Sequence, residues 1–222
     1  MKKHTILFLA ANPSGTDRLE LDREARSIRV ELERSGYRDC FELETRWAAE
    51  PLDLLRELRK LKPTVVHFSG HSGQNGLFFQ AADGSPQVVS AEALEATFGA
   101  AGASVSVVVL NACYTEAQAE ALLAHVDCVV GMSGAIRDDA ARSFAIGFYG
   151  GLGERESVAA AYRQGCAAIS LGGPIDGERP LSDRDVMEPG QDEMEPAPGR
   201  DRPRLKVRGG VDPGRLVLAD PR

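Results

Sequence analysis

The segment 105–115, VSVVVLNACYT, constrains the fold of this chain more than any other. Five of the six residues at 105–110 are apolar and four of them are valine, which is typical of a strand buried on both faces inside a parallel sheet. Thr115 is followed three residues later by Gln118, and this capping-box spacing predicts that a helix begins at once. Cys113 is therefore expected on a tight strand-to-helix connection at the carboxyl edge of the sheet, where open α/β sheets bind ligands.

A second apolar run ends in a similar place. The segment 64–73, TVVHFSGHSG, predicts a short strand that breaks at glycine and leaves His71 at its exit. If both strands lie in one parallel sheet, His71 and Cys113 project from the same edge, and the helix amino terminus beside Cys113 favours its thiolate. Cysteine with histidine is the minimal set for nucleophilic catalysis, because imidazole can take the thiol proton and later give it to the leaving group.

The length, composition and net charge limit the kinds of binding partner that are expected. A chain of 222 residues, 43% apolar and 27% charged, can form one substantial core without a second domain. The net charge of −7 and the absence of a dense cluster among the 26 basic residues argue against a nucleic-acid partner. No segment approaches the ~18 apolar residues of a membrane span, so no membrane partner is expected.

The number and spacing of the cysteines indicate a reducing compartment and argue against a bound metal. The four cysteines are widely spread without a CxxC pair, which fits neither a zinc ribbon nor a disulfide framework: Cys40, Cys113, Cys128 and Cys166. The amino-terminal residues resemble a very short signal peptide, but no A-x-A site follows and the same residues make a good first strand. We expect a cytoplasmic protein without a cofactor or a metal.

Strands and helices alternate along the first 132 residues. This order predicts an α/β three-layer sandwich, with a mostly parallel central sheet covered by helices on both faces. The expected strands are 5–10, 41–45, 64–70, 105–110 and 127–132, and the expected helices are 17–35, 51–62, 90–98, 115–125 and two further ones that begin near Asp138 and Ser157. The runs 77–80 and 86–90 flank a turn sequence and predict a small β-hairpin appendage.

The carboxyl-terminal part divides by composition. Residues 172–204 are rich in proline, glycine and acidic side chains, which predicts a flexible segment. Residues 205–222 contain two short β-like runs and are expected to complete the sheet of the core formed by residues 1–171.

Other residues near His71 in the sequence have simpler structural interpretations. His67 and His71 share the spacing of a helical zinc pair, but a β-rich run precedes them, so His67 is expected to point into the core with its ring nitrogens satisfied locally. Gly70, Gly73 and Gly76 do not form a phosphate-binding pattern. They either permit turns or let a substrate backbone approach, leaving amide N–H groups free to face an oxyanion.

These motifs resemble those of a known family. HFSGHS at 67–72, followed by VVVLNAC at 107–113, is similar to the histidine and cysteine motifs of the CHAT family of caspase-like cysteine peptidases, and the block 136–152 is similar to the motif that follows them. The resemblance runs from Thr5 to about Ser170, with a weaker echo at 205–218. It implies a caspase-like fold and hydrolysis of peptide bonds.

The resemblance also implies roles for single residues. His71 would be the general base and acid, and Cys113 the nucleophile. The backbone N–H groups of Cys113 and Ser72 would bind the oxyanion, although the family commonly has glycine at the latter position. Asp138 matches an acidic position near the specificity pocket and could help to bind a basic side chain, while its alternative role is that of a helix N-cap.

Three functions from different classes remain open. The first is a cysteine endopeptidase that cleaves a protein target after activation by a separate sensor protein, in a bacterial defence or cell-death system. The second is a catalytically silent binding or signalling module of the same fold. The third is a different α/β protein, such as a cysteine amidotransferase or a signalling domain of the TIR or receiver type. An amidotransferase places its histidine after the cysteine, where only His125 is found, and a receiver-like domain needs an acidic residue at the strand end. The oligomeric state and the substrate stay open.

Overall fold

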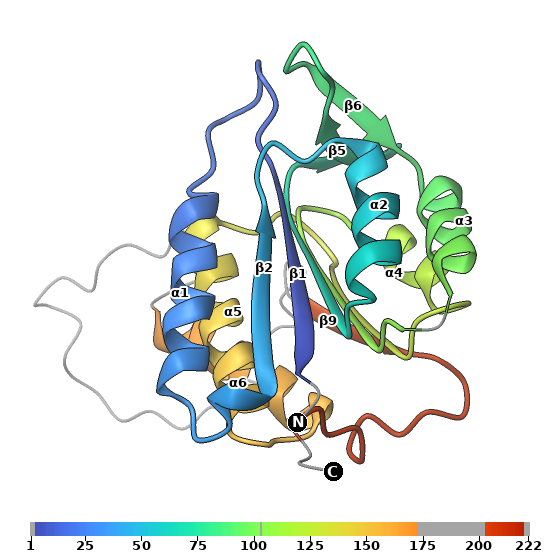
Figure 1. Cartoon of the computed structure of the whole chain (residues 1–222). Helices are drawn as coiled ribbons and strands as arrows, with labels where there is room; N and C mark the ends of the chain where they lie inside the picture. Colours follow the sequence, from blue (N-terminus) through green and yellow to red (C-terminus); the bar gives the residue numbers. More distant parts are fainter. Residues whose placement is uncertain (1–2, 103, 173–202, 220–222) are drawn as a thin grey trace, which may run out of the picture.

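The computed structural model describes residues 3–102, 104–172 and 203–219, and its centre is a six-stranded sheet between two layers of helices (Figure 1). The strand order is β2-β1-β3-β7-β8-β9, and every neighbouring pair is parallel except β8 with β9. The predicted three-layer α/β fold is confirmed. The strands are β1 (His4–Ala11), β2 (Phe41–Arg46), β3 (Val65–Gly70), β7 (Val107–Asn111), β8 (Cys128–Met132) and β9 (Pro203–Val207).

Within the described residues, three helices cover each face of the sheet. On one side lie α1 (Leu21–Arg34), α5 (Asp138–Gly153) and α6 (Val158–Leu171), and on the other lie α2 (Pro51–Leu61), α3 (Ala91–Ala101) and α4 (Glu116–Leu122) (Figure 1). A short 3₁₀ turn, Arg38–Cys40, precedes β2. Each layer encloses its own hydrophobic core, because successive side chains of a strand point to opposite faces.

The alternation along β3 decides which residues meet α1. Val65 packs in the core beneath α1 and α5, whereas Val66 and Phe68 pack in the core beneath α2. His67 and Ser69 share the parity of Val65 and therefore face α1 and α5. Polar side chains thus enter an otherwise apolar layer on one face of the central sheet.

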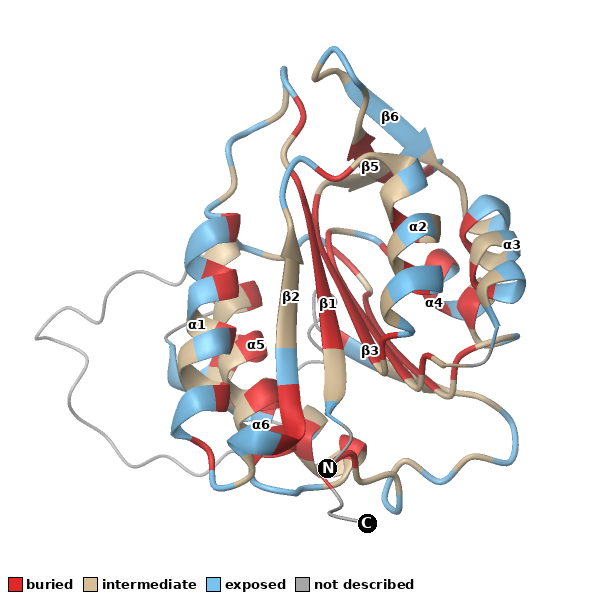
Figure 2. Ribbon diagram, in the orientation of Figure 1, coloured by how far each residue is buried: buried red, intermediate tan, exposed pale blue. Residues whose placement is uncertain are grey.

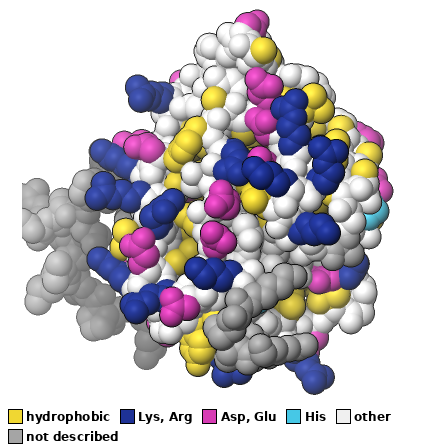
Figure 3. All heavy atoms as spheres, in the orientation of Figure 1, with side chains coloured by type: hydrophobic (Ala, Val, Ile, Leu, Met, Phe, Trp, Pro, Cys, Tyr) yellow, Lys and Arg dark blue, Asp and Glu magenta, His cyan; other side chains and the backbone are white. Residues whose placement is uncertain are grey.

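The predicted central strand lies where its sequence requires. β7 runs between β3 and β8, and all five of its residues are buried, as are those of β3 and β8 (Figure 2). In contrast, β2 is an edge strand with mostly half-buried residues, as its alternating sequence predicts. On the face that includes β2, basic and acidic side chains are interspersed rather than segregated (Figure 3).

The appendage lies above the carboxyl ends of the parallel strands (Figure 1). It is a three-stranded antiparallel sheet of β4 (Ser72–Gly73), β5 (Gly76–Gln80) and β6 (Pro86–Val89). The predicted hairpin is therefore confirmed, and β4 adds a strand directly after His71. Gly76 has φ +144°, and a Cβ at this position would lie 2.0 Å from the Val89 carbonyl oxygen, so the turn requires glycine.

One local prediction is wrong. Thr115 precedes α4, but its hydroxyl does not cap the helix. The hydroxyl lies 3.2 Å from the Ala112 carbonyl oxygen, to which it can donate, and it accepts the Met132 N–H at 2.8 Å. Gln118 is buried instead of reaching back toward the helix start. The Thr115 side chain therefore ties the loop that carries Cys113 to β8, a tertiary contact that outweighs the local cap.

Residues 203–219 form the described part of the carboxyl-terminal region. Most of the predicted flexible segment, 172–204, lies outside the described residues. β9 pairs with β8 from Pro203 to Val207, and a bridge joins Val217 to Ser157 ahead of α6. Within the described ranges, no helix combines the length and apolar character needed to cross a membrane.

Candidate active site

The topology opens a crevice at one end of the sheet. After β1 the chain moves outward to β2 and then returns to β3 on the other side of β1, so the loops after β1 and β3 diverge. A pocket of about 260 Å³ lies at these carboxyl ends. Its walls come from the loop after β1, the exits of β3 and β7, and the segment that enters α5. His71, Cys113 and Asp138, which the sequence places far apart, all line it.

His71 leaves the sheet with a defined tautomer. Its Nε2 lies 2.7 Å from the carbonyl oxygen of Asp17 in the loop after β1. Because a carbonyl only accepts, Nε2 donates, and Nδ1 of the neutral ring is left as an acceptor. Gly70 permits this exit, since a Cβ there would lie 2.7 Å from the Ala11 carbonyl oxygen. The ring can therefore take up one proton at Nδ1.

Cys113 follows β7 on the tight connection that its sequence predicts. The Ile136 N–H donates to its Sγ at 3.4 Å, which holds the sulfur beside the segment that enters α5. The next residue, Tyr114, has φ +53° and is 60% exposed. A non-glycine residue in this conformation is strained, and the Tyr114 N–H bond to the Gly134 carbonyl helps to hold it.

The two side chains share the pocket without bonding to each other. Among the described residues, the hydrogen bond of the His71 ring goes to Asp17 and those of the Cys113 sulfur go to Ile136. Both residues are half-buried, so reagents can reach them. In enzymes without bound substrate, catalytic hydrogen bonds are often long and tighten only in the complex.

Ser72 connects the histidine segment to the cysteine loop. Its hydroxyl donates to the Cys113 carbonyl oxygen. The His71 carbonyl accepts the Phe78 N–H, so Ser72 and Leu77 form a non-hydrogen-bonded pair of the small sheet, and the Ser72 N–H points away from β5. The Cys113 N–H donates to none of the described residues. Neither the Ser72 N–H nor the Cys113 N–H therefore takes part in the backbone hydrogen bonds of the two sheets.

Asp138 is the first residue of α5 rather than its cap. Arg137 occupies the N-cap position and makes no capping bond with its side chain, so the N-cap role considered for Asp138 is not found. The Asp138 carboxylate accepts the Glu20 N–H at 3.2 Å, which joins α5 to the start of α1 at the pocket wall.

Beneath the pocket lies a buried polar layer that the sequence analysis did not predict. Glu24 of α1 is 5% exposed and accepts hydrogen bonds from three side chains: His67 Nε2 at 2.9 Å, the Ser69 hydroxyl and the Asn111 amide. The other ring nitrogen of His67 lies 3.0 Å from the Tyr149 hydroxyl. The register that pairs Ser69 with Asn111 on β3 and β7 brings these donors together.

The hydrogen bonds in this layer set its charge. Burial alone would raise the pKa of Glu24, but the charge and hydrogen bond of His67, with the bonds from Ser69 and Asn111, outweigh it and lower the pKa. Burial, reinforced by the Glu24 charge, raises the pKa of Tyr149 well above its usual value. The layer therefore holds a carboxylate next to a neutral phenol.

The CHAT domain family matches residues 3–172, which is more than half of the chain. This chain belongs to the CHAT domain family. A protein named Roc-COR-CHAT protease, from an unknown prokaryotic organism, is 29% identical over 172 residues, which are 74% of this chain and 16% of that protein. The CHAT chain thus spans about one sixth of that relative's length. The resemblance to the CHAT family stated above is confirmed.

The sequence of α1 contains a pattern that indicates the buried polar layer. The apolar residues of α1 recur at Leu21, Ala25, Ile28 and Leu32, and Glu24 lies within this stripe, three positions after Leu21 and four before Ile28. A carboxylate on the inward face of a helix needs buried donors. His67 is buried as expected, but its partners lie 43 and 82 positions away rather than nearby.

The CHAT pocket offers no visible metal site. Over the described ranges there is no group of three histidine, cysteine or acidic side chains that could hold a metal ion. The groups that the structure gathers here are a thiol, an imidazole, backbone N–H donors and the carboxylates of the pocket wall.

Proposed function

We propose that this CHAT chain is a cysteine endopeptidase in which Cys113 is the nucleophile and His71 the general base and acid. The observation that carries the proposal is their shared pocket at the carboxyl ends of β3 and β7. The Asp17 carbonyl fixes the His71 tautomer that leaves Nδ1 open for the thiol proton. Membership of the CHAT domain family and the similarity to a protein named a protease support the same reaction.

The reaction follows from these groups. His71 Nδ1 takes the proton of Cys113, and the thiolate attacks the carbonyl carbon of the scissile peptide bond. The N–H groups of Cys113 and Ser72 hold the oxyanion, and loss of one such donor typically costs about 10²- to 10³-fold in rate. The imidazolium then protonates the departing amine. Water, deprotonated by His71, hydrolyses the thioester and restores the thiol.

Activation by a separate partner, in a bacterial defence or cell-death system, is part of the proposal. The relative's name joins CHAT to Roc and COR, and this chain spans 16% of that protein. The four cysteines form no disulfide with one another, and a thiolate nucleophile persists in a reducing compartment, so the site would operate in the cytoplasm. The test compares the rate at which a peptide probe labels Cys113 in the purified chain and in an extract of its source cells. Equal rates would remove the partner from the proposal.

A labelling experiment tests the dyad without knowledge of the target. The chain is treated with a set of peptidyl acyloxymethyl ketones, which alkylate activated thiols, and the adduct is located by mass spectrometry. We expect one adduct on Cys113, absent in Cys113→Ala and slowed at least about a hundredfold in His71→Ala, since a general base typically contributes 10² to 10⁴. Cys166→Ala, which changes a half-buried cysteine outside the pocket, is the matched control.

Two results would count against the dyad. Equal labelling of the native chain and His71→Ala would show that the imidazole has no part in activating the thiol. Failure of every peptide probe to label Cys113, with and without the cell extract, would leave the catalytically silent binding module as the better description.

A further inference from the structure

The small sheet connects His71 to an exposed edge strand. Ser72 of β4 lies opposite Leu77 of β5, and Phe78 of β5 lies opposite Val88 of β6. One position before Ser72, the His71 carbonyl accepts the Phe78 N–H at 2.9 Å, so the β4–β5 pairing continues to the histidine. His71, Phe78 and Val88 are therefore aligned across the three strands, and we call them the His71 row.

The His71 row lies on the face of the small sheet that is turned away from the core. Leu77 and Phe79 pack in the core beneath α2. Successive residues of a strand point to opposite faces, and residues directly opposite on neighbouring strands share a face. Phe78 is half-buried and Val88 is 48% exposed, on a strand that is mostly exposed (Figure 2). An apolar surface therefore begins at His71 and ends at Val88.

The small sheet is uncharged along its whole length. As the structure describes them, β4, β5 and β6 contain no acidic or basic residue. A Cβ at Gly73 would lie 3.0 Å from the Phe78 ring, so glycine at this position leaves room for the ring between His71 and Val88. The surface is therefore suited to an apolar side chain rather than to a charged one.

The proposed reaction indicates what covers this surface. The His71 imidazolium protonates the departing amine, so the part of the substrate that follows the scissile bond begins beside His71. The acyl part stays on Cys113, in a pocket that neither Phe78 nor Val88 lines. The His71 row leads away from the histidine in another direction, and the pocket and the row can hold the two sides of the scissile bond.

Strand geometry sets how much of the substrate the row can hold. Neighbouring strands lie 4.7–4.9 Å apart, so two such spacings place Val88 about 10 Å from His71 along the row. An extended chain advances about 3.3 Å per residue. Three residues therefore cover the row, and the third residue after the scissile bond reaches Val88.

We propose that Phe78 and Val88 bind the substrate segment that follows the scissile bond and select an apolar side chain at its third residue. The inference rests on the proposed peptidase function and adds a specificity determinant to it. Phe78 and Val88 act by contact with the departing segment and take no part in proton transfer. A charged side chain would lose water on this uncharged surface without gaining a partner.

The test uses probes that carry residues on both sides of the reactive group. In a peptide fumaramide, a conjugated double bond replaces the scissile bond. The Cys113 thiolate adds to one of its carbons, and a proton adds to the other. Each probe keeps the peptide of the ketone that labels Cys113 fastest and has leucine, serine or aspartate at the third residue beyond the double bond. We expect leucine to react at least about fivefold faster than serine, and aspartate slowest, because contact with the row buries apolar surface.

Variants of Val88 assign the preference to the row. Val88→Ser removes apolar surface and should reduce the leucine-to-serine ratio to below about twofold. Val88→Lys places a cation at an exposed position and should make the aspartate probe faster than the serine probe, a gain that loss of folding cannot produce. Leu52→Ser changes a 58% exposed leucine of α2, outside the small sheet, and should keep the native ratio. Ratios within one variant cancel any change in the reactivity of Cys113.

The outcomes separate this inference from the peptidase proposal. Equal leucine and serine rates in the native chain, with Cys113 modified by both probes, would overturn the inference alone, and a partner protein would then be the occupant to test. A native ratio in Val88→Ser, with no gain for aspartate in Val88→Lys, would also overturn it. If iodoacetamide modifies Cys113 but no ketone or fumaramide does, the peptidase proposal fails and this inference fails with it.

Discussion

His67 and His71 lie four residues apart, yet they belong to two different regions of the molecule. His67 is fully buried on β3, where Glu24 and Tyr149 occupy both ring nitrogens. His71 lies one residue beyond β3 at the pocket, with one nitrogen bonded to Asp17 and the other left as an acceptor. A histidine with both nitrogens occupied supports structure, whereas one with a free acceptor can move a proton.

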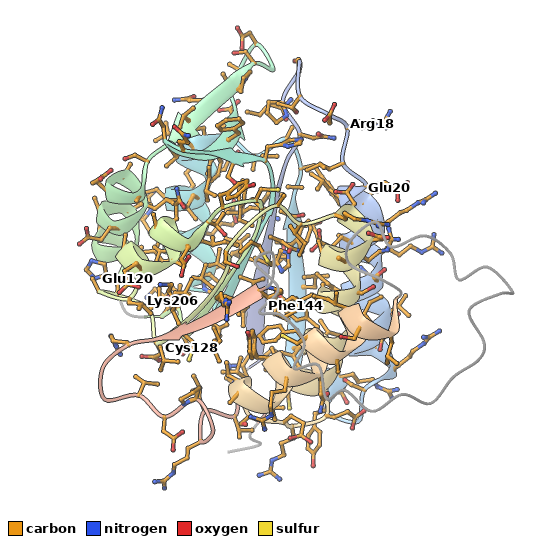
Figure 4. The ribbon with its side chains drawn as sticks, turned by 180° about the vertical axis from the view of Figure 1, so that it is seen from behind. Arg18, Glu20, Glu120, Cys128, Phe144 and Lys206 are labelled. Carbon is orange, nitrogen blue, oxygen red and sulfur yellow. The ribbon has the colours of Figure 1, made fainter. Side chains whose placement is uncertain are left out.

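The cysteines repeat this contrast. Cys113 follows the carboxyl end of β7 and lines the pocket, while Cys128 begins β8 and is fully buried. Figure 4 shows Cys128 toward the end of the sheet opposite Glu20. Burial, together with the charge of Asp127, raises the pKa of Cys128 to about 11. The two ends of the parallel strands therefore differ in chemistry: the carboxyl ends expose reactive groups, and the amino ends bury inert ones.

The largest expected difference between these regions is in thiol reactivity. With a pKa of about 11, only ~0.1% of Cys128 is ionised at pH 8, and its sulfur is also shielded. We expect iodoacetamide to modify Cys113 at least about a hundredfold faster than Cys128 in the folded chain, measured by peptide mass spectrometry over time. In urea-unfolded protein the difference should disappear, and comparable rates in the folded protein would contradict the contrast.

The second prediction concerns stability. Glu24 is a buried carboxylate, and removal of a partner that leaves a buried charge uncompensated typically costs about 3–5 kcal/mol, so His67→Ala should lower the free energy of unfolding by about that amount. His71→Ala removes one partly exposed hydrogen bond and should cost about 1 kcal/mol or less. Urea denaturation followed by circular dichroism measures both variants. Similar losses for the two would mean that the buried layer has no special structural role.

The smallest effect is expected in acid. The pKa of Glu24 is lowered from its ordinary value of 4.5 by His67 and the layer's hydrogen bonds, against the opposing effect of burial. The unfolded chain therefore binds more protons than the folded chain just below pH 4.5, and stability falls as the pH decreases through that range. Glu24→Gln should show a weaker loss in urea titrations between pH 5 and 3. Glu33→Gln, on the exposed side of α1, is the control and should retain the loss.

Much of the fold could be predicted because its patterns are local. The apolar run of β7, the alternation of β2 and the stripe of α1 each reflect one element and the side on which it is buried. The position of the site at the carboxyl edge of the sheet could also be predicted, because His71 and Cys113 each follow the end of a parallel strand. The capping role assigned to Thr115 failed, because a contact with β8 competed with a bond within its own turn.

The remaining parts of the site depend on contacts between distant segments. The bond from His71 to the Asp17 carbonyl and the bond from the Ile136 amide to Cys113 involve loop backbone groups, and no side chain marks those positions in the sequence. The orientation of the Asn111 amide is likewise decided by Glu24 and the Ala141 carbonyl, which accept hydrogen bonds from its nitrogen.

The sequence by itself determined the layers, the central strand and the two residues whose chemistry suggests a peptidase, since hydrophobic periodicity and residue type are properties of short segments. Only the tertiary structure decided which groups bond to each of the two histidines and which residues line the pocket. The physical reason is that hydrogen-bond partners and burial depend on strand order and helix packing, which bring together residues as distant in sequence as Glu20 and Asp138, 118 positions apart.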